Sequence, residues 1–313
     1  MDRIIDISES AATLHVRYAQ LVIEPEAGAE VTTPLAEIAV LVISHPRVLM
    51  SQAVISGIAE NGGSVLICDQ KFLPAAMMLP LQTHSTQSER FARQAQATLP
   101  LRKRLWQQIV RAKIGAQGRL LHELHGEDGG LLAMAPRVRS GDAGHLEAQA
   151  SRRYWPLLFG DPHFRRGREG PDQNSHLNYG YAVLRSITAR ALCAAGLHPS
   201  LGLQHHNRYD AFCLANDLME PFRPVVDRAV YFYIQEHDPA LPLDKSAKAF
   251  LIGELLRRYR CEGEERTLFD VVARAASSLA RAFLGESTSL QIPEVSYAPT
   301  ALGVSSYVAD GDV

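Results

Sequence analysis

The spacing of apolar residues along this 313-residue chain changes its period once, near residue 80. Before that point, short β-branched runs are separated by proline, glycine and acidic residues, a pattern typical of strands. The runs are Arg3–Ile7, Thr13–Val16, Gln20–Glu24, Ile38–Ile43 and Ser64–Asp69. One helical spacing interrupts them at 51–60, and Asn61-Gly62-Gly63 is expected to end it. The first 80 residues therefore predict a small β-rich domain.

From residue 86 onward, apolar residues recur every three or four positions, which indicates helices. The residues Thr86 and Glu89 form a capping-box pattern at the start of this part. The expected helices lie in the basic segment up to 122 and over 141–155, 178–195, 212–220, 224–235, 245–259 and 267–284. Pro156 and Gly196 are expected to end the helices that precede them. We predict an α+β protein with a small N-terminal β-rich domain at 1–80, a linker at 81–89, a larger all-α C-terminal domain at 90–285 and a loosely ordered tail at 286–313.

Positive charge is concentrated in two segments of a chain whose formal net charge is only −2. The segment 90–122 carries eight lysines and arginines and no acidic residue, and 152–168 carries five arginines against one aspartate. Local positive fields in a nearly neutral protein favour a directed anionic partner. A solvated helix face, balanced by acidic residues elsewhere, explains the same charge equally well.

The cysteines and the absence of long apolar runs point to a cytoplasmic protein. Cys68, Cys193, Cys213 and Cys261 lie far apart and form no C-x-x-C pair, which argues against a zinc ribbon or a disulfide framework. The first ten residues contain no apolar core of a secretory signal, and the longest aliphatic run, Ile38–Ile43, is too short to cross a membrane. We expect no membrane partner.

The segment 202–227 gathers the residues best suited to chemistry. It contains His205, His206, Asp217, Glu220 and Arg223. Asp217 and Glu220 are three positions apart and share one face of an otherwise apolar predicted helix. Two carboxylates on such a face are costly to bury unless a cation lies near them. With a histidine upstream and an arginine downstream, the segment predicts a metal site for a phosphate-bearing substrate.

Glu147 is the best candidate for a further ligand. It lies in the predicted helix 141–155, and its i+4 neighbour is Ser151, so no ion pair at that spacing accounts for it. Carboxylate and imidazole ligands suit Mg²⁺ or Mn²⁺, and the lack of cysteine disfavours structural zinc. A carboxylate-bound ion beside arginines suits phosphoryl transfer. The residues leave open which histidine and which of Asp217 and Glu220 would bind.

Two segments carry motifs of a known family, GLQHHNRYDAFCLANDLMEPFRPVVD and HLEAQASRRYWPLLFG. They resemble the core motif and the glutamate helix of the CRISPR adaptation integrases, known as CRISPR-associated protein one. Its Tyr-Gly-Tyr helix is similar to LNYGYAVLRSITARALCAAGLHPSLG. The segment ICDQKFLPAAMMLP resembles members from systems with a single large RNA-guided nuclease. The resemblance spans roughly residues 3–235.

The resemblance implies a site as well as a fold. By motif position, the catalytic and metal-binding residues are Glu147, His205 and Glu220, with Mg²⁺ or Mn²⁺ as cofactor. The motif histidine follows Gly-Leu-Gln directly, which selects His205 over His206. Asp217 matches a motif acid with an auxiliary role.

The resemblance also implies a reaction and partners. Family members insert short foreign DNA into a CRISPR array, by attack of a 3′-hydroxyl on a repeat-end phosphodiester, and act as metal-dependent DNA endonucleases. The implied partners are a second copy of the chain paired through 1–80, the double-stranded prespacer and repeat DNA, the small ferredoxin-like CRISPR-associated protein two and the large nuclease, in a prokaryotic cytoplasm. Expected contacts to the DNA backbone are Arg102, Lys103, Arg104, Arg152, Arg153 and Arg223.

Two other classes of protein remain to be weighed. A carboxylate-bridged di-metal oxidase uses two Glu-x-x-His pairs. Glu123 and His125 are two positions apart, and Glu236 and His237 are adjacent, so neither pair fits. A non-catalytic helical scaffold that binds nucleic acid through 90–122 is the alternative that stays open.

Overall fold

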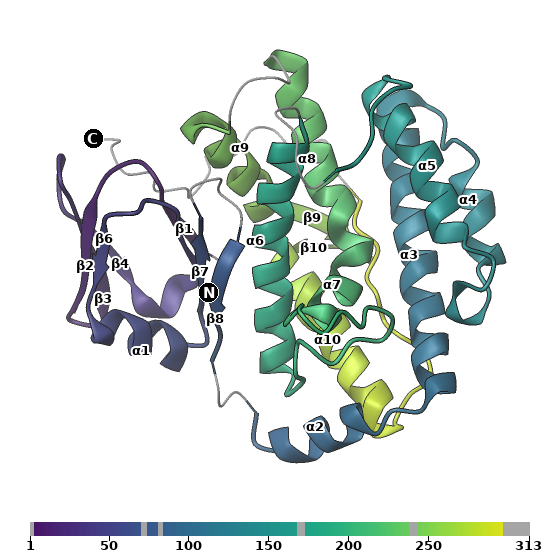
Figure 1. Cartoon of the computed structure of the whole chain (residues 1–313), viewed down its shortest axis with the longest axis horizontal. Helices are drawn as coiled ribbons and strands as arrows, with labels where there is room; N and C mark the ends of the chain where they lie inside the picture. Colours follow the sequence, from purple (N-terminus) through teal and green to yellow (C-terminus); the bar gives the residue numbers. More distant parts are fainter. Residues whose placement is uncertain (1–2, 70–73, 81–83, 168–172, 238–242, 297–313) are drawn as a thin grey trace.

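The computed structural model describes residues 3–69, 74–80, 84–167, 173–237 and 243–296. A β-rich part forms one side of the molecule, and a mainly helical part forms the rest (Figure 1). The α+β architecture expected from the sequence is therefore confirmed. No helix in these described ranges is long and apolar enough to cross a membrane.

The β-rich part contains two four-stranded sheets and one α-helix, α1 (Gln52–Glu60). In the order of the first sheet, the strands are β1 (Arg3–Ile7), β5 (Ile38–Ile43), β7 (Ser64–Cys68) and β8 (Pro74–Met78). In the second sheet they are β4 (Val31–Pro34), β3 (Gln20–Pro25), β2 (Ala12–Arg17) and β6 (Val48–Met50). Strands β1, β5 and β7 are parallel, and β8 is antiparallel to β7. Three strands of this part were not predicted: β4 and β6 are too short to show a period, and β8 has no β-branched residue.

The first sheet is a middle layer with a core on each face. All six residues of β5 are buried, as expected for a parallel strand covered on both sides. Ile38, Leu41 and Ile43 pack toward the second sheet. Val40 and Val42 belong to the larger core of the helical part. The two parts of the chain therefore share this sheet.

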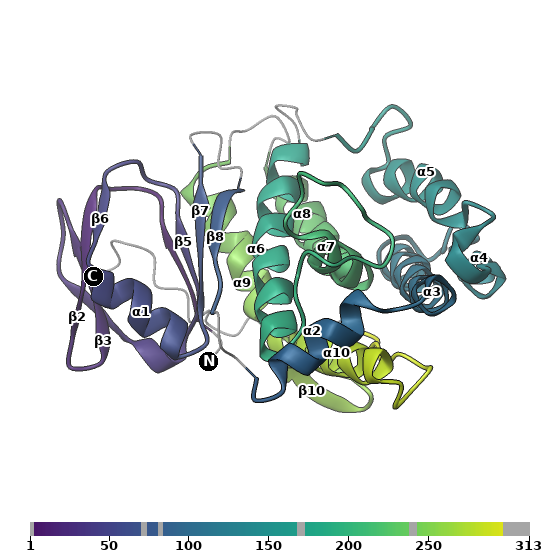
Figure 2. The same cartoon turned by 60° about the horizontal axis from the view of Figure 1, so that its bottom comes forward.

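The helical part surrounds one long helix, α6, which lies beside the first sheet (Figures 1 and 2). The helices are α2 (Gln87–Ala95), α3 (Leu99–His125), α4 (Leu131–Met134), α5 (Leu146–Phe159), α6 (Gln173–Ala194), α7 (Cys213–Met219), α8 (Arg223–Glu236), α9 (Lys245–Leu256) and α10 (Leu268–Leu284). A single 3₁₀ turn, η4 (Glu220–Phe222), joins α7 to α8. A Cβ atom at Gly180 of α6 would lie only 2.5 Å from Val226 of α8, so glycine permits their close packing.

A two-stranded hairpin corrects the expectation of an all-α C-terminal part. The helix expected at 245–259 ends at Leu256, and β9 (Arg258–Cys261) then pairs with β10 (Glu264–Thr267). The two residues between them, Glu262 and Gly263, both have positive φ, as in the tight turns that favour hairpins. This Glu-Gly turn was not predicted from the sequence.

The helix that carries Glu147 also differs from its prediction. It begins at Leu146 rather than 141 and continues through Pro156 to Phe159, where Gly160 ends it with φ 63°. Proline removes one backbone hydrogen bond. The extra turn buries Leu158 and places Phe159 in edge contact with Phe164, at 4.7 Å between ring centroids. This apolar packing offsets the missing bond.

The predicted linker and tail are more structured than expected where the chain is described. Helix α2 begins at Gln87, inside the predicted linker 81–89, of which 81–83 lie outside the described residues. The Thr86 hydroxyl contacts Nδ1 of His84 instead of capping α2, so the capping box does not form.

In the tail, Gln108 donates to the Thr288 carbonyl and accepts from the Leu290 amide. Residues 286–296 are thus held against α3, while 297–313 lie outside the described residues, and the domain boundaries themselves stay predictions.

Candidate metal and nucleic-acid site

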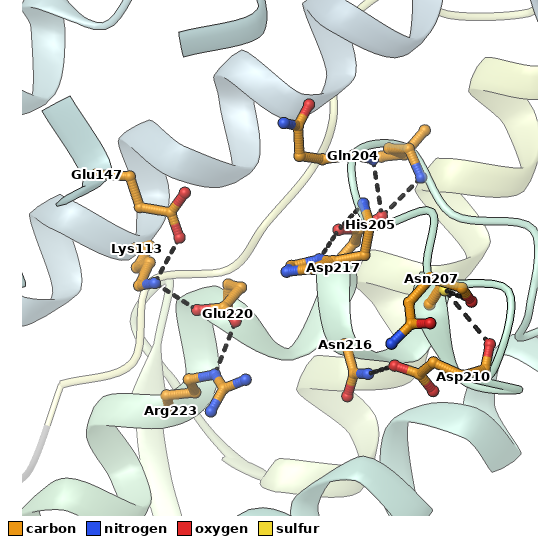
Figure 3. A network of polar contacts seen from close by, with 12 residues as sticks. Lys113, Glu147, Gln204, His205, Asn207, Asp210, Asn216, Asp217, Glu220 and Arg223 are labelled. Atoms are coloured by element: carbon orange, nitrogen blue, oxygen red, sulfur yellow. Dashed lines mark hydrogen bonds and ion pairs between the residues drawn. The ribbon is translucent and has the colours of Figure 1, made fainter. Parts of the chain in front are cut away.

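Four elements bring the predicted site residues to one region of the helical part (Figure 3). Helix α5 contributes Glu147 from its first turn, and η4 contributes Glu220. The loop before α7 contributes His205, and α7 itself contributes Asp217. Helix α3 adds Lys113, which was not among the predicted site residues and belongs to the basic segment 90–122.

Asp217 organises the loop that carries the histidine. Its fully buried carboxylate accepts the backbone amides of Leu203 at 2.6 Å, Gln204 at 3.1 Å and His205 at 3.3 Å. It also lies 2.5 Å from Nδ1 of His205, and this hydrogen bond raises the pKa of His205 against the effect of partial burial. A side chain at Gly202 would collide with the His205 carbonyl oxygen, so this turn requires glycine.

This hydrogen bond also sets which nitrogen of His205 is available. When Nδ1 donates its hydrogen to a carboxylate, Nε2 keeps a lone pair, which is the arrangement found in metal-binding histidines. The structure gives Nε2 no hydrogen-bond partner within the described ranges. The Trp106 ring lies edge-on to the imidazole at 5.9 Å between centroids and supports its orientation.

Glu220 is a buried carboxylate between two cations. Its Oε1 accepts from Nε of Arg223 at 2.8 Å, and its Oε2 lies 2.6 Å from Nζ of Lys113. Burial opposes ionisation, but Arg223 and Lys113 outweigh it and hold the pKa of Glu220 at about 2. Glu220 is therefore an anion at neutral pH despite being only 4% exposed.

Glu147 is positioned by the start of its helix. Asp142 accepts the backbone amides of Leu146 at 2.9 Å and Glu147 at 3.0 Å, and so satisfies amides that have no partner within the helix. Asp142 and His145 both have positive φ, so the chain turns sharply just before α5. The result places Oε1 of Glu147 2.7 Å from Nζ of Lys113.

Lys113 joins the two glutamates. Its ammonium group contacts both Glu147 and Glu220, and the residue is only 8% exposed (Figure 3). Burial alone would lower the pKa of Lys113, but Glu220 and Glu147 together raise it. The sequence carried a signal for this role, because Lys113 shares the apolar face of α3 with Ile109 and Val110.

Comparisons with known proteins identify the family of the chain. The model of the family described as CRISPR associated protein Cas1 matches residues 5–240. A CRISPR-associated endonuclease Cas1 from Neisseria meningitidis serogroup C (strain 8013) is 33% identical over 290 residues, which cover 92% of this chain and 94% of the relative. This chain belongs to the Cas1 family. The resemblance found in the sequence is confirmed, and with it the enzyme class, an endonuclease of the Cas1 type.

Solved structures share the fold of this Cas1 family member. A casposase bound to an integration product has a TM-score of 0.79 and 20% identity, with 96% of each chain covered. A Cas6-RT-Cas1–Cas2 complex has a TM-score of 0.68 and 21% identity, covering 93% of this chain and 36% of the other. At these identities the likeness concerns the fold.

The donor groups in this Cas1 site are of chemical types that bind divalent cations. Glu147 and Glu220 already share one cation, the Lys113 ammonium, and carboxylate with imidazole is a donor set that Mg²⁺ and Mn²⁺ accept. Across the described residues, however, no three His, Cys, Asp or Glu side chains are grouped closely enough to hold an ion. Lys113 stands between the glutamates, and His205 is turned toward Asp217.

The predicted DNA-contacting residues of this Cas1 family member lie in three different locations. Arg152 and Arg223 line a cavity of about 640 Å³ beside Glu220. Arg102 lines a second, smaller cavity together with His205 and His206. Lys103, Arg104 and Arg153 are exposed and line neither cavity. The first cavity also contains residues that the sequence analysis did not select: Trp155, Phe164, Arg165 and Arg166.

Proposed function

We propose that this Cas1 protein inserts short DNA into a CRISPR array and cleaves DNA at the same site, with Mg²⁺ or Mn²⁺ as cofactor. Glu147, Glu220 and Nε2 of His205 would hold the ion, and Asp217 would orient the histidine. The observation that carries the proposal is the pair of glutamates sharing one buried cation, beside a histidine fixed by a buried carboxylate. Perturbed ionisable groups of this kind are typical of functional sites.

In the proposed reaction, the oxygen of a DNA 3′-hydroxyl attacks a phosphorus atom of the repeat. The bond from that phosphorus to the 3′-oxygen of the cleaved strand breaks. The attacking hydroxyl loses its proton to solvent, and the departing 3′-oxygen takes up a proton from solvent and leaves as a hydroxyl. A bound divalent ion supplies Lewis-acid chemistry to the phosphate. Arg152 and Arg223, which line the adjacent cavity, would neutralise phosphate charge. Because Arg223 and Lys113 keep Glu220 ionised, its carboxylate carries the negative charge that a metal ligand needs at neutral pH.

The proposed partners follow from the family and from the similar structures. Double-stranded prespacer and repeat DNA would contact Arg102, Lys103, Arg104 and Arg153, which give affinity without sequence preference. The casposase and the Cas1–Cas2 complex, which share the fold, support DNA and Cas2 as partners. Residues 1–80 would pair two copies, 90–285 would carry catalysis, and the large nuclease would join the assembly in the cytoplasm.

A strand-transfer assay tests the proposal. The purified protein is incubated with Cas2, a prespacer duplex, a repeat plasmid and Mn²⁺. We expect Glu147→Gln, His205→Ala and Glu220→Gln each to reduce the joined product by at least about 100-fold, since groups of this kind act as a unit. Glu265→Gln, an exposed glutamate on the hairpin, is the matched control and keeps full activity.

The same assay separates the enzyme from a non-catalytic scaffold. A scaffold that binds nucleic acid through 90–122 would bind DNA equally well with EDTA and would join no strands under Mn²⁺. Full strand transfer in all three variants would instead show that the reaction occurs elsewhere in the protein.

A further inference from the structure

We propose that the Lys113 ammonium holds Glu147 and Glu220 together until a divalent ion displaces it. Lys113 and the ion would then compete for the same position between the two carboxylates. The inference rests on the proposed function, because it assumes that the ion binds these two glutamates. It adds a positioning residue from α3 and predicts a coupling between metal and DNA.

The distances indicate that the Lys113 ammonium and a divalent ion would occupy nearly the same position. Nζ of Lys113 lies 2.7 Å from Oε1 of Glu147 and 2.6 Å from Oε2 of Glu220. This Oε2 atom is buried and has no hydrogen-bond partner within the described ranges, so its ion pair with Lys113 supplies the counter-charge. Mg²⁺ binds carboxylate oxygens at about 2.0–2.1 Å. An ion that reached both oxygens would therefore lie within a few ångströms of the ammonium, where like charges repel strongly.

The structure also provides a place for the displaced ammonium. Lys113 and Gln117 both line the 640 Å³ cavity beside Glu220. They are four positions apart on α3, so their side chains are neighbours on the helix surface. Gln117 is only 3% exposed, and its Oε1 is buried without a hydrogen-bond partner among the described residues. This oxygen can accept a hydrogen bond from the Lys113 ammonium once the glutamates release it.

The occupant of the cavity decides how readily Lys113 moves. The same cavity is lined by four arginines, Arg152, Arg165, Arg166 and Arg223. Moving the Lys113 ammonium toward them is unfavourable while the cavity holds no anion, because like charges repel. A DNA phosphate in the cavity reverses this effect. DNA therefore favours the displaced position of Lys113, and metal and DNA each strengthen the binding of the other, as linkage requires.

Mn²⁺ binding, measured by electron paramagnetic resonance on the full chain, tests the inference without using activity. We expect Lys113→Gln to bind Mn²⁺ about tenfold more tightly than the wild type in the absence of DNA, because one competing charge is removed. Lys113→Arg keeps the charge and is expected to bind no more tightly than the wild type. The matched control is Lys245→Gln on α9, a half-buried lysine paired with Glu9 away from the two glutamates, which leaves Mn²⁺ affinity unchanged.

The second measurement is the effect of DNA. A short duplex is expected to increase the Mn²⁺ affinity of the wild type several-fold and to have a much smaller effect on Lys113→Gln. Thermal melting guards against misfolding: Mn²⁺ should raise the melting temperature of Lys113→Gln more than that of the wild type, since stabilisation follows affinity.

The outcomes distinguish this inference from the proposed function. Unchanged or weaker Mn²⁺ binding by Lys113→Gln, with normal binding by the wild type, overturns the inference alone. A wild type that binds no Mn²⁺, or that binds it equally well after Glu147→Gln and Glu220→Gln, overturns the metal site and the inference with it.

Discussion

At the scale of single residues, the two buried carboxylates of the site, Glu220 and Asp217, each have defined partners. Glu220 has two cations, and Asp217 has three backbone amides and an imidazole. Breaking a buried pair by removing one partner is strongly destabilising, because the other charge stays buried. Substitutions of these buried residues should therefore keep the shape of the side chain. A loss of activity can then be attributed to the missing charge rather than to disturbed packing.

Asp217→Asn tests whether the carboxylate orients the histidine. The amide keeps the size of the side chain but removes the charge that holds three amides and Nδ1 of His205. We expect Mn²⁺ affinity and strand transfer to fall about 10- to 100-fold, as is usual when the partner of a metal-binding histidine is lost. The pKa of His205, followed by NMR titration, falls as well. His206→Gln is the control; equal losses in both variants would contradict the choice of His205.

Asp227, which is not a proposed metal ligand, is expected to make the stability of the protein depend on pH. Burial raises its pKa to about 6, against the hydrogen bonds from the hydroxyls of Tyr181 and Tyr154. Because the folded pKa lies above the unfolded value, the folded protein binds the proton more tightly. This contribution to stability is complete below about pH 4 and is lost as the pH rises through 6. Urea denaturation between pH 4 and 7 measures it.

The expected loss is about 3 kcal/mol, since each pKa unit corresponds to about 1.4 kcal/mol. It is obtained as the difference between the wild type and Asp227→Asn at each pH, because the amide does not titrate. A difference that stays constant from pH 4 to 7 would show that Asp227 remains ionised in the folded protein.

At the scale of elements, the sequence predicts structure wherever the local pattern and the final environment agree. The predicted bounds of strand β5 and helix α10 agree closely with the structure. Burial of both faces gives β5 a continuous apolar run, and a single apolar face gives α10 a clear helical period. Strand β6 has only three residues, and α5 passes through Pro156 because aromatic packing outweighs a local preference. The bounds of such elements depend on tertiary contacts, which the spacing of residues in the sequence does not reveal.

The start of α5 offers a test of an element that positions a ligand. Asp142 caps the turn before Glu147, and Asp244 caps α9 by accepting the amide of Ala247 at 2.9 Å, away from the site. We expect Asp142→Ala and Asp244→Ala each to lower the free energy of unfolding by about 0.5–2 kcal/mol. Only Asp142→Ala is expected to reduce strand transfer, about tenfold, because a small displacement of Glu147 impairs the site. Similar activity in both variants would mean that the cap serves stability alone.

At the scale of the whole molecule, the candidate site shows the limit of reasoning from sequence. The identities of Glu147, His205 and Glu220 came from motif order, because they lie up to 73 positions apart and no spacing rule joins them. Lys113 was missed because its charge placed it within a basic segment. Its role follows from α3 passing between α5 and η4, and that arrangement depends on the packing of the complete helical part.

The shared sheet predicts that the two parts of the chain unfold together. Tyr179 of α6 donates to Asp6 of β1 at 3.1 Å, and Ser64 of β7 contacts Ser186 of α6 at 3.0 Å. Because β5 contributes to both cores, loss of the helical part would expose one face of the sheet. We expect tryptophan fluorescence, which reports on Trp106 and Trp155 of the helical part, and far-UV circular dichroism to give one coincident transition.

Tyr179→Phe tests this coupling at the junction itself. It removes a hydroxyl donor from a buried carboxylate, and we expect the free energy of unfolding to fall by about 1–3 kcal/mol. Both probes should shift by the same amount, since the two cores unfold as one. Tyr18→Phe, on a tyrosine that is 91% exposed, leaves both transitions unchanged. A variant in which circular dichroism shifts while tryptophan fluorescence does not would show that the β-rich part unfolds independently, and that the shared sheet does not bind the two parts into one cooperative unit.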